Sequence, residues 1–105
     1  MIDAGRLRKL RNAIPVHEVL RGTLGIRVYQ EGGYWRFQCP LCNAYDTATN
    51  PKTNLARCFR CRKNFNPIDL VMMVAKCDFL DAVTELEAIL RARLNHQNAA
   101  DFGHR

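Results

Sequence analysis

The sequence predicts an α+β fold, in which a small ribbon of β-hairpins is flanked by short N-terminal helices and two C-terminal helices. Three observations support this prediction: two C-x-x-C pairs enclose a loop-rich segment, two β-prone segments meet at Glu31-Gly32-Gly33, and a helix signal begins at Asn66-Pro67. A chain of 105 residues is about the size of one domain. We therefore expect one domain with short terminal segments.

The N-terminal segment is basic and has a helical pattern. Between Asp3 and Leu20, leucine and isoleucine recur at roughly helical intervals among arginines and a lysine, and Pro15 interrupts the pattern. This arrangement predicts two short helices. We expect residues 1–13 to form a basic helical arm and residues 14–94 to form the ribbon domain.

A β-hairpin is expected before the first cysteine pair. Residues 26–30 and 34–38 are β-prone, and the glycines between them can adopt the positive φ of a hairpin turn. Residues 43–54 are rich in Asn and Thr and contain Pro51, so a loop is expected there. Residues 55–59 are then expected to return as a strand.

Two helices are predicted after the second cysteine pair. Asn66 can cap a helix that begins at Pro67, and the helix is apolar almost all round to about residue 76, which predicts a central place in the core. Another helix is expected after Asp78. Its expected buried face comprises Phe79, Val83, Leu86 and Leu90, whereas Glu87 is expected to face water and pair with Arg91. Residues 95–105 lack periodicity and are predicted to be a disordered tail.

The charge of the chain is positive and unevenly distributed. The formal net charge is +6, and the basic residues concentrate before residue 67 while the remainder is slightly acidic. A basic surface favours an acidic partner, of which nucleic acid is the commonest. No signal peptide or membrane-spanning segment is predicted, so we expect a cytoplasmic protein without a membrane partner.

The two C-x-x-C pairs predict a metal site. Cys39 and Cys42 form the first pair, Cys58 and Cys61 form the second, and fifteen residues separate the pairs, as in a zinc ribbon. Four thiolates would close a tetrahedron around one Zn²⁺ and leave no position for water, so the predicted zinc is structural. A reactive dithiol or an iron–sulfur site is the alternative, but the βαβ pattern of a thioredoxin-like protein is missing.

The other metal-binding residue types lack ligand spacing. Cys77 lies outside both pairs and is expected to be a buried free thiol. His17 lies in the N-terminal helical segment, and His96 and His104 lie in the C-terminal segment. We interpret none of the three histidines as a ligand.

Aromatic and basic residues gather on the hairpin and around the second cysteine pair. Alternation along residues 34–37 predicts that Trp35 and Phe37 share one face, expected to be core, and that the other face is exposed. Exposed rings stack on unpaired bases and cations neutralise phosphates. The candidate nucleic-acid-binding residues are Tyr34, Arg36, Arg57, Arg60, Arg62 and Lys63. The alternative is that the aromatic residues belong to the core and the cations are only solvated.

The order of these elements resembles the N-terminal zinc-binding domain of DnaG-type bacterial and phage primases. The likeness covers roughly residues 14–90, and it is most specific in Asn66-Pro67-Ile68-Asp69-Leu70-Val71-Met72, after the second cysteine pair. The resemblance implies that Cys39, Cys42, Cys58 and Cys61 hold zinc and that the ribbon binds single-stranded template DNA. Cellular primases usually have histidine at the position of Cys42, whereas phage primase-helicases have cysteine there.

The resemblance does not extend to catalysis. Primases continue into a catalytic domain with an Asp-x-Asp metal site, and this sequence contains no Asp-x-Asp. We expect a stand-alone, non-catalytic zinc ribbon that binds single-stranded DNA and acts in trans with a primase, polymerase or helicase of a phage or mobile element, and no small-molecule substrate. The alternative is a protein–protein adaptor, in which the acidic final helix or the basic ribbon docks on a replication or transcription enzyme.

Overall fold

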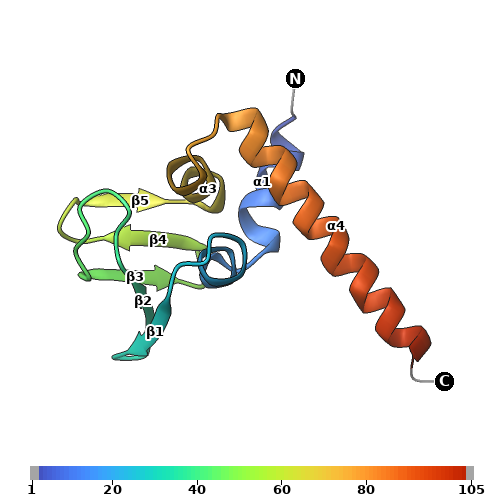
Figure 1. Cartoon of the computed structure of the whole chain (residues 1–105), viewed down its shortest axis with the longest axis horizontal. Coiled ribbons are helices and arrows are strands. Elements are labelled where there is room, and N and C mark those ends of the chain that lie inside the picture. The colour runs from blue at the N-terminus through green and yellow to red at the C-terminus, as the bar shows by residue number, and fades with distance from the viewer. Residues whose placement is uncertain (1–2, 104–105) are drawn as a thin grey trace.

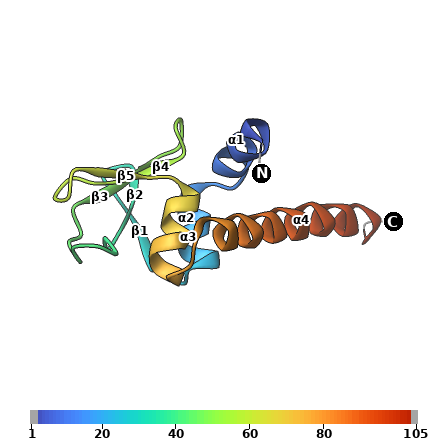
Figure 2. The ribbon, with the colours of Figure 1, turned by 90° about the horizontal axis from the view of Figure 1, so that it is seen from above.

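The computed structural model describes residues 3–103, with side chains described as far as residue 95. Strands gather at one end of the molecule and helices at the other, and α4 extends away from the strands (Figures 1 and 2). The predicted α+β ribbon with flanking helices is confirmed. The elements in chain order are α1 (Ala4–Ala13), α2 (Val16–Glu18), a π-helical turn (Val19–Thr23), β1 (Val28–Glu31), β2 (Tyr34–Phe37), β3 (Thr47–Asn50), β4 (Leu55–Cys58), β5 (Lys63–Phe65), α3 (Pro67–Ala75) and α4 (Phe79–Gly103).

The first sheet is the predicted hairpin. Strands β1 and β2 pair antiparallel, from Val28 opposite Phe37 to Glu31 opposite Tyr34. Gly32 and Gly33 form the two-residue connection with φ values of 63° and 82°. Positive φ at both positions gives a turn whose twist matches that of the paired strands, and glycine adopts it without a steric penalty.

The second sheet contains two strands that the sequence pattern did not predict. Its order is β3-β4-β5, with antiparallel pairing throughout. Thr47 and Thr49 of β3 are both buried, which suits β-branched side chains on the inner face of a sheet. The hydroxyl of Thr47 donates to the Phe37 carbonyl and accepts from the Phe37 amide, so it joins the two sheets. The expected loop at residues 43–54 is therefore corrected to a loop followed by a strand and a turn.

Two hydrophobic cores lie side by side. The helical core joins α1, α3 and α4, and the ribbon core lies under the sheets. The helical core comprises Leu10, Ile14, Val19, Ile68, Val71, Ala82, Val83 and Leu86. The ribbon core comprises Val16, Leu20, Phe37, Cys39, Ala56, Cys58, Phe65 and Leu70.

Helix α1 packs on the rest of the molecule and contributes Leu10 to the helical core. Its N-cap Asp3 accepts a hydrogen bond from the Arg6 amide, and Leu10 is only 2% exposed. Contacts with α3 and α4 hold the helix against the rest of the molecule. The basic side chains of α1 remain on its outer side, so a helix can carry positive charge and still contribute to the core.

Helix α3 begins as predicted. The Asn66 side chain accepts from the Asp69 amide at 2.8 Å, and the Asp69 carboxylate accepts from the Asn66 amide at 3.0 Å. This reciprocal capping box satisfies two amides that the first turn would leave unpaired. Ile68 and Val71 enter the helical core while Leu70 enters the ribbon core, so α3 separates the two cores.

Helix α4 differs from its prediction in three respects. It continues to Gly103, so the expected disordered tail from residue 95 is helical as far as the described residues extend. No proline lies between Phe79 and Gly103 to interrupt the helix. Phe79 is 39% exposed instead of buried, because the first turn reaches beyond the helical core. Glu87 pairs with Arg6 of α1 instead of Arg91, because the packing of α1 on α4 brings Arg6 within reach.

The helices in the described part of the chain are not suited to spanning a bilayer. None of them combines the length and the apolar composition that a membrane crossing requires.

Candidate metal centre and nucleic-acid interface

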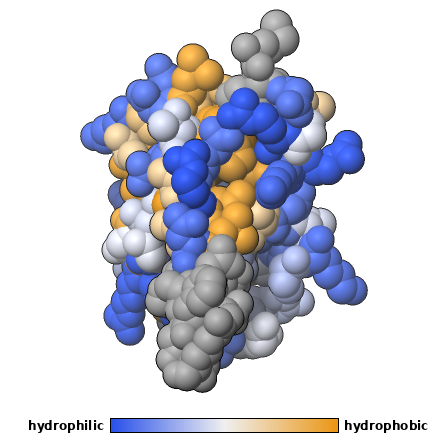
Figure 3. All heavy atoms as spheres, turned by 90° about the vertical axis from the view of Figure 1, so that its right-hand side faces the viewer, coloured by the Kyte–Doolittle hydropathy of each residue, from blue (hydrophilic) through white to orange (hydrophobic). Residues whose placement is uncertain are grey.

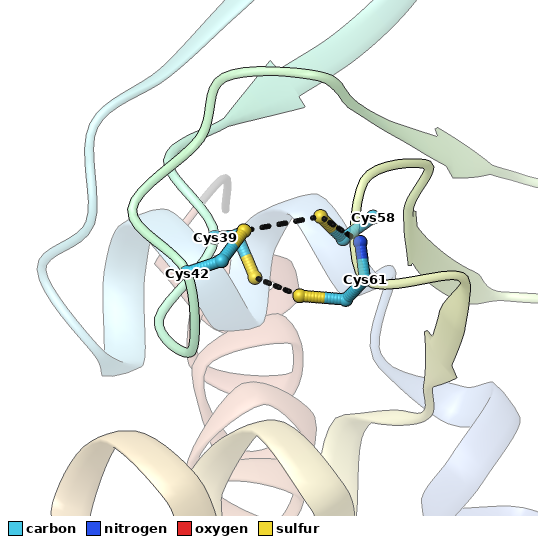
Figure 4. Close-up of side chains that lie close together, drawn as sticks. All are labelled: Cys39, Cys42, Cys58 and Cys61. Atoms are coloured by element: carbon cyan, nitrogen blue, oxygen red, sulfur yellow. Dashed lines mark hydrogen bonds between the residues drawn. The ribbon is translucent and has the colours of Figure 1, made fainter.

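Four cysteine side chains converge where the loop after β2 meets the turn between β4 and β5 (Figure 4). Cys39 and Cys42 lie in the turn that follows β2, Cys58 ends β4, and Cys61 lies in the turn before β5. The Sγ atoms of Cys39 and Cys61 are 3.8 Å apart, and those of Cys42 and Cys58 are 3.6 Å apart. All four sulfur atoms lie within 4.8 Å of one another.

The two cysteine turns have similar backbone hydrogen bonds. In each turn an amide donates to the sulfur of the first cysteine, from Leu41 to Cys39 at 3.4 Å and from Cys61 to Cys58 at 3.3 Å. The residue after each pair then donates its amide back to the carbonyl of the first cysteine. Asn43 and Arg62 occupy these positions with φ values of 63° and 59°. The left-handed conformation at these positions lets the chain turn back after each pair.

The donor set fits one zinc ion. Zinc–thiolate bonds of about 2.3 Å in a tetrahedron place the sulfur atoms about 3.8 Å apart, close to the two shortest separations observed. Cys39 and Cys58 are fully buried, and Cys42 and Cys61 are half-buried. Four protein ligands complete the coordination sphere and leave no position for water or substrate, so this zinc is structural.

The surroundings of the thiols affect how they release protons. Hydrogen bonding from the Ala44 amide lowers the pKa of Cys42 to about 7, whereas burial raises the pKa of Cys39. The hydrogen bond with Cys42 raises the pKa of Cys61 to about 12. Zinc binds thiolates and must displace the protons that remain at neutral pH, so zinc affinity falls as the pH falls.

The remaining cysteine and His17 lie outside the metal cluster. The Cys77 thiol is half-buried at the end of α3, 3.8 Å from the Val71 carbonyl oxygen, and burial raises its pKa. His17 instead stacks on Trp35. The His96 side chain and the whole of His104 fall outside the described residues.

A groove crosses the outer face of β2, β3 and β4. Tyr34 and Arg36 reach it from β2, and Arg57 and Phe59 reach it from β4 and the turn that follows. Tyr34 is 51% exposed and Phe59 is 47% exposed, so both rings are accessible. The full lining is Tyr34, Arg36, Ala48, Thr49, Asn50, Pro51, Lys52, Thr53, Leu55, Arg57, Phe59 and Asn64. None of these described residues is acidic.

The groove arginines also make contacts within the protein. The Arg36 guanidinium donates to the Thr47 carbonyl at 2.7 Å and to the Glu31 carbonyl at 3.3 Å. Arg57 donates to the Asn64 side chain at 3.2 Å, and its guanidinium lies 5.6 Å from the centre of the Phe59 ring. These contacts hold both cations at the groove.

The other candidate residues lie outside this groove. Arg60, Arg62 and Lys63 are exposed on the turn between β4 and β5 and at the start of β5. Sequence reasoning missed Lys52 and Leu55 as part of the surface, because β3 was expected to be a loop. The alternation of Trp35 and Phe37 is confirmed, although only Phe37 is fully buried and Trp35 is half-buried.

Comparison with known proteins identifies the family. The model of the CHC2 zinc finger, the zinc ribbon of DnaG, matches residues 2–101 and so includes the N-terminal helix, the ribbon and most of α4. No match was found among curated proteins. The match spans nearly the whole chain and agrees with the four-cysteine centre. The chain therefore belongs to the CHC2 zinc finger family, the zinc-ribbon domain of DnaG-type primases.

Proposed function

We propose that this protein is a non-catalytic zinc-ribbon module that binds single-stranded DNA through the groove over β2, β3 and β4. The observation that carries the proposal is the composition of this groove, which combines two accessible aromatic rings with three cations and no carboxylate. Surfaces that bind single strands use this combination, because rings stack on bases while cations track the phosphates.

Each part of the site has a separate role in this proposal. Zinc fixes the turn that carries Phe59, and so positions this ring beside Arg57. Tyr34 and Phe59 provide stacking surfaces, and Arg36, Lys52 and Arg57 attract phosphates. Arg60, Arg62 and Lys63 add positive charge at the rim and guide the strand toward the groove.

The proposal extends to a cellular role. A primase-type ribbon that recognises template DNA without catalysing synthesis would act in trans with a primase, polymerase or helicase. We place this role in the cytoplasm, in the replication of a phage or mobile element. The closed zinc centre supports a non-catalytic role, because its four protein ligands leave zinc no open position for Lewis-acid chemistry.

The test is fluorescence anisotropy of a labelled single-stranded oligonucleotide, titrated with zinc-loaded protein at several salt concentrations. We expect binding that weakens with salt at a log–log slope of about −0.7 per phosphate contact, and weaker binding to duplex. Arg57→Ala should weaken binding more than Arg60→Ala, because Arg57 lines the groove and Arg60 does not. Arg91→Ala is the matched control, since it removes an exposed arginine from α4. Absence of binding at low salt would contradict the proposal.

A protein–protein adaptor is the second candidate function. Leu80 and Leu94 of α4 are 62% and 49% exposed, and the side of the molecule that carries α1 and α4 shows hydrophobic surface between hydrophilic flanks (Figure 3). A replication enzyme retained by the zinc-loaded protein after nuclease treatment, and lost with Leu94→Glu, would favour this function.

A further inference from the structure

A second hollow adjoins the groove on the other side of Tyr34. The two depressions share Tyr34, Thr49, Pro51 and Lys52, so the turn after β3 and the start of β2 form a common rim. The second hollow measures about 590 Å³, which is within the range of sites for small organic groups. Its full lining is Asn12, Pro15, Val16, His17, Gln30, Gly33, Tyr34, Trp35, Thr49, Pro51, Lys52 and Asn54.

A stacked pair of rings forms part of the wall of this hollow. The ring centres of His17 and Trp35 are 4.9 Å apart, and the ring planes differ by only 6°. The Arg21 guanidinium lies 5.8 Å from the centre of the Trp35 ring, one helical turn after His17. Trp35 is half-buried, whereas Phe37 on the same face of β2 is fully buried. The pair is therefore held in place and still borders the hollow.

The groove and the hollow differ in charge. Arg36 and Arg57 line only the groove, and Lys52 on the shared rim is the only lysine or arginine that lines the hollow. The hollow instead has the exposed carboxamides of Asn12 and Gln30, and none of its described lining residues is acidic. Phosphates are bound by cations. A base is bound by an aromatic ring on which it stacks and by uncharged groups that form hydrogen bonds with its polar edge.

The third amide in the hollow is already occupied within the protein. The Asn54 side chain donates to the carbonyls of Arg11 and Ile14 and accepts from the Val16 amide. Its hydrogen-bonding capacity is largely used, and it fixes the wall of the hollow. The exposed Gln30 carboxamide can face a ligand, whereas Asn12 Nδ2 donates to the Arg8 carbonyl at 2.8 Å and the Asn12 Oδ1 is the atom that can accept a hydrogen bond from a ligand.

We propose that this hollow is a nucleobase site. A single DNA strand whose backbone follows the groove passes Tyr34 and Lys52 and places one base against the His17–Trp35 pair. The carboxamides of Asn12 and Gln30 form hydrogen bonds with the polar edge of that base. The protein therefore prefers certain base types at this one position of the strand. This inference rests on the proposed function and adds to it a specific base site.

Trp35 provides a direct reporter, because it is the only tryptophan in the chain. The experiment titrates the full zinc-loaded chain with labelled single-stranded oligonucleotides of one base type each, and follows label anisotropy and Trp35 emission together. We expect a saturable loss of Trp35 emission with the same midpoint as the anisotropy change. A duplex of the same length should leave the emission unchanged, because its bases are paired and stacked.

Two variants test the contacts. His17→Ala removes one stacking ring and should weaken binding about 5-fold or more. Gln30→Ala changes an exposed side chain and should alter the relative affinities for the four base types by several-fold. Gln38→Ala is the matched control, because Gln38 is also exposed but does not line the hollow, and its preferences should match those of the unmodified protein. Zinc content checks the fold of each variant.

The outcomes separate the two proposals. Salt-dependent binding with unchanged Trp35 emission, or with base preferences that Gln30→Ala leaves intact, would overturn the base site and leave the groove as the binding surface. Equal loss of emission with duplex would also overturn it. Absence of any binding to single strands at low salt would overturn both proposals.

Discussion

The ribbon core and the helical core are held together in different ways. Cys39 and Cys58, two of the four zinc ligands, are members of the ribbon core, whereas no zinc ligand belongs to the helical core. The ribbon strands contain only three or four residues each, too few to bury much apolar surface. Zinc–thiolate bonds therefore add to hydrophobic burial in the ribbon half, whereas the helical half depends on helix packing without a metal ligand.

The two halves touch at α3, at Leu24 and at Asn54. Helix α3 contributes to both cores, and Leu24 packs against both. Asn54, in the turn between β3 and β4, holds the chain between α1 and α2 through three hydrogen bonds. The following predictions test whether the halves depend on different forces, beginning with the largest expected effect.

Loss of zinc should disrupt the ribbon and spare part of the helical half. Cys58→Ala removes a ligand, and zinc binding in small modules is worth about 10–16 kcal/mol. We expect loss of bound zinc and of the sheets, with helical circular dichroism retained in part. Cys77→Ala is the control, since Cys77 lies outside the cluster and should leave zinc bound. Complete loss of helical signal would show that the helical core also depends on zinc.

Truncation in the helical core should destabilise the protein without releasing zinc. Leu86 is fully buried there, and Leu86→Ala should lower the free energy of unfolding by about 2–5 kcal/mol. Chemical denaturation of the zinc-loaded protein measures this change. Leu94→Ala, which truncates an exposed leucine of the same helix, should have little effect. A parallel fall in zinc affinity would contradict the division into two independent cores.

Removal of the Asn54 side chain should loosen the contact between the halves. Asn54→Gly tolerates the φ of 56° at this position but leaves the Val16 amide without its partner. We expect a loss of about 1–3 kcal/mol in the free energy of unfolding. Hydrogen exchange should accelerate at Val16, with zinc stoichiometry unchanged. Unchanged exchange at Val16 would show that Asn54 does not hold the two halves together.

The smallest expected effect is a gain in stability at the second cysteine turn. Arg62 has a φ of 59°, a conformation that costs a residue with a Cβ atom about 1–2 kcal/mol. Arg62→Gly removes this cost but increases the entropy of the unfolded chain, so the net gain should be about 0.5–1 kcal/mol. Thermal unfolding of the zinc-loaded protein measures the change, and Arg60→Gly should give no such gain, because Arg60 is not among the residues with positive φ.

Local patterns were sufficient to predict several elements. The glycine pair predicted the β1–β2 hairpin, and Asn66-Pro67 predicted the start of α3. The spacing of the cysteines predicted the zinc centre, and alternation placed Tyr34 and Arg36 opposite Phe37 on β2. The hairpin, the helix start and the alternation depended on residues within one turn or one strand, where local conformational preferences are strong, whereas the zinc centre depended on two cysteine pairs fifteen residues apart.

Other features depended on contacts between distant residues. Strand β3 has a loop-like composition, and it forms because β4 supplies hydrogen-bonding partners and Thr47 contacts Phe37. The Arg6 and Glu87 pair also joins residues that are distant in the sequence. No local pattern predicts such partners, because they are determined by which helices pack together.

The sequence by itself determined the chemistry of this protein: four thiolates for zinc, a basic first part, and rings interspersed with arginines. Residue types and their spacing indicate which side chains can bind zinc, so the zinc ligands can be inferred without coordinates. Only the tertiary structure decided that Tyr34, Arg57 and Phe59 border one groove and that His17 stacks on Trp35 beside it. These groups come from different elements, and the packing of the two sheets and the N-terminal helices brings them together.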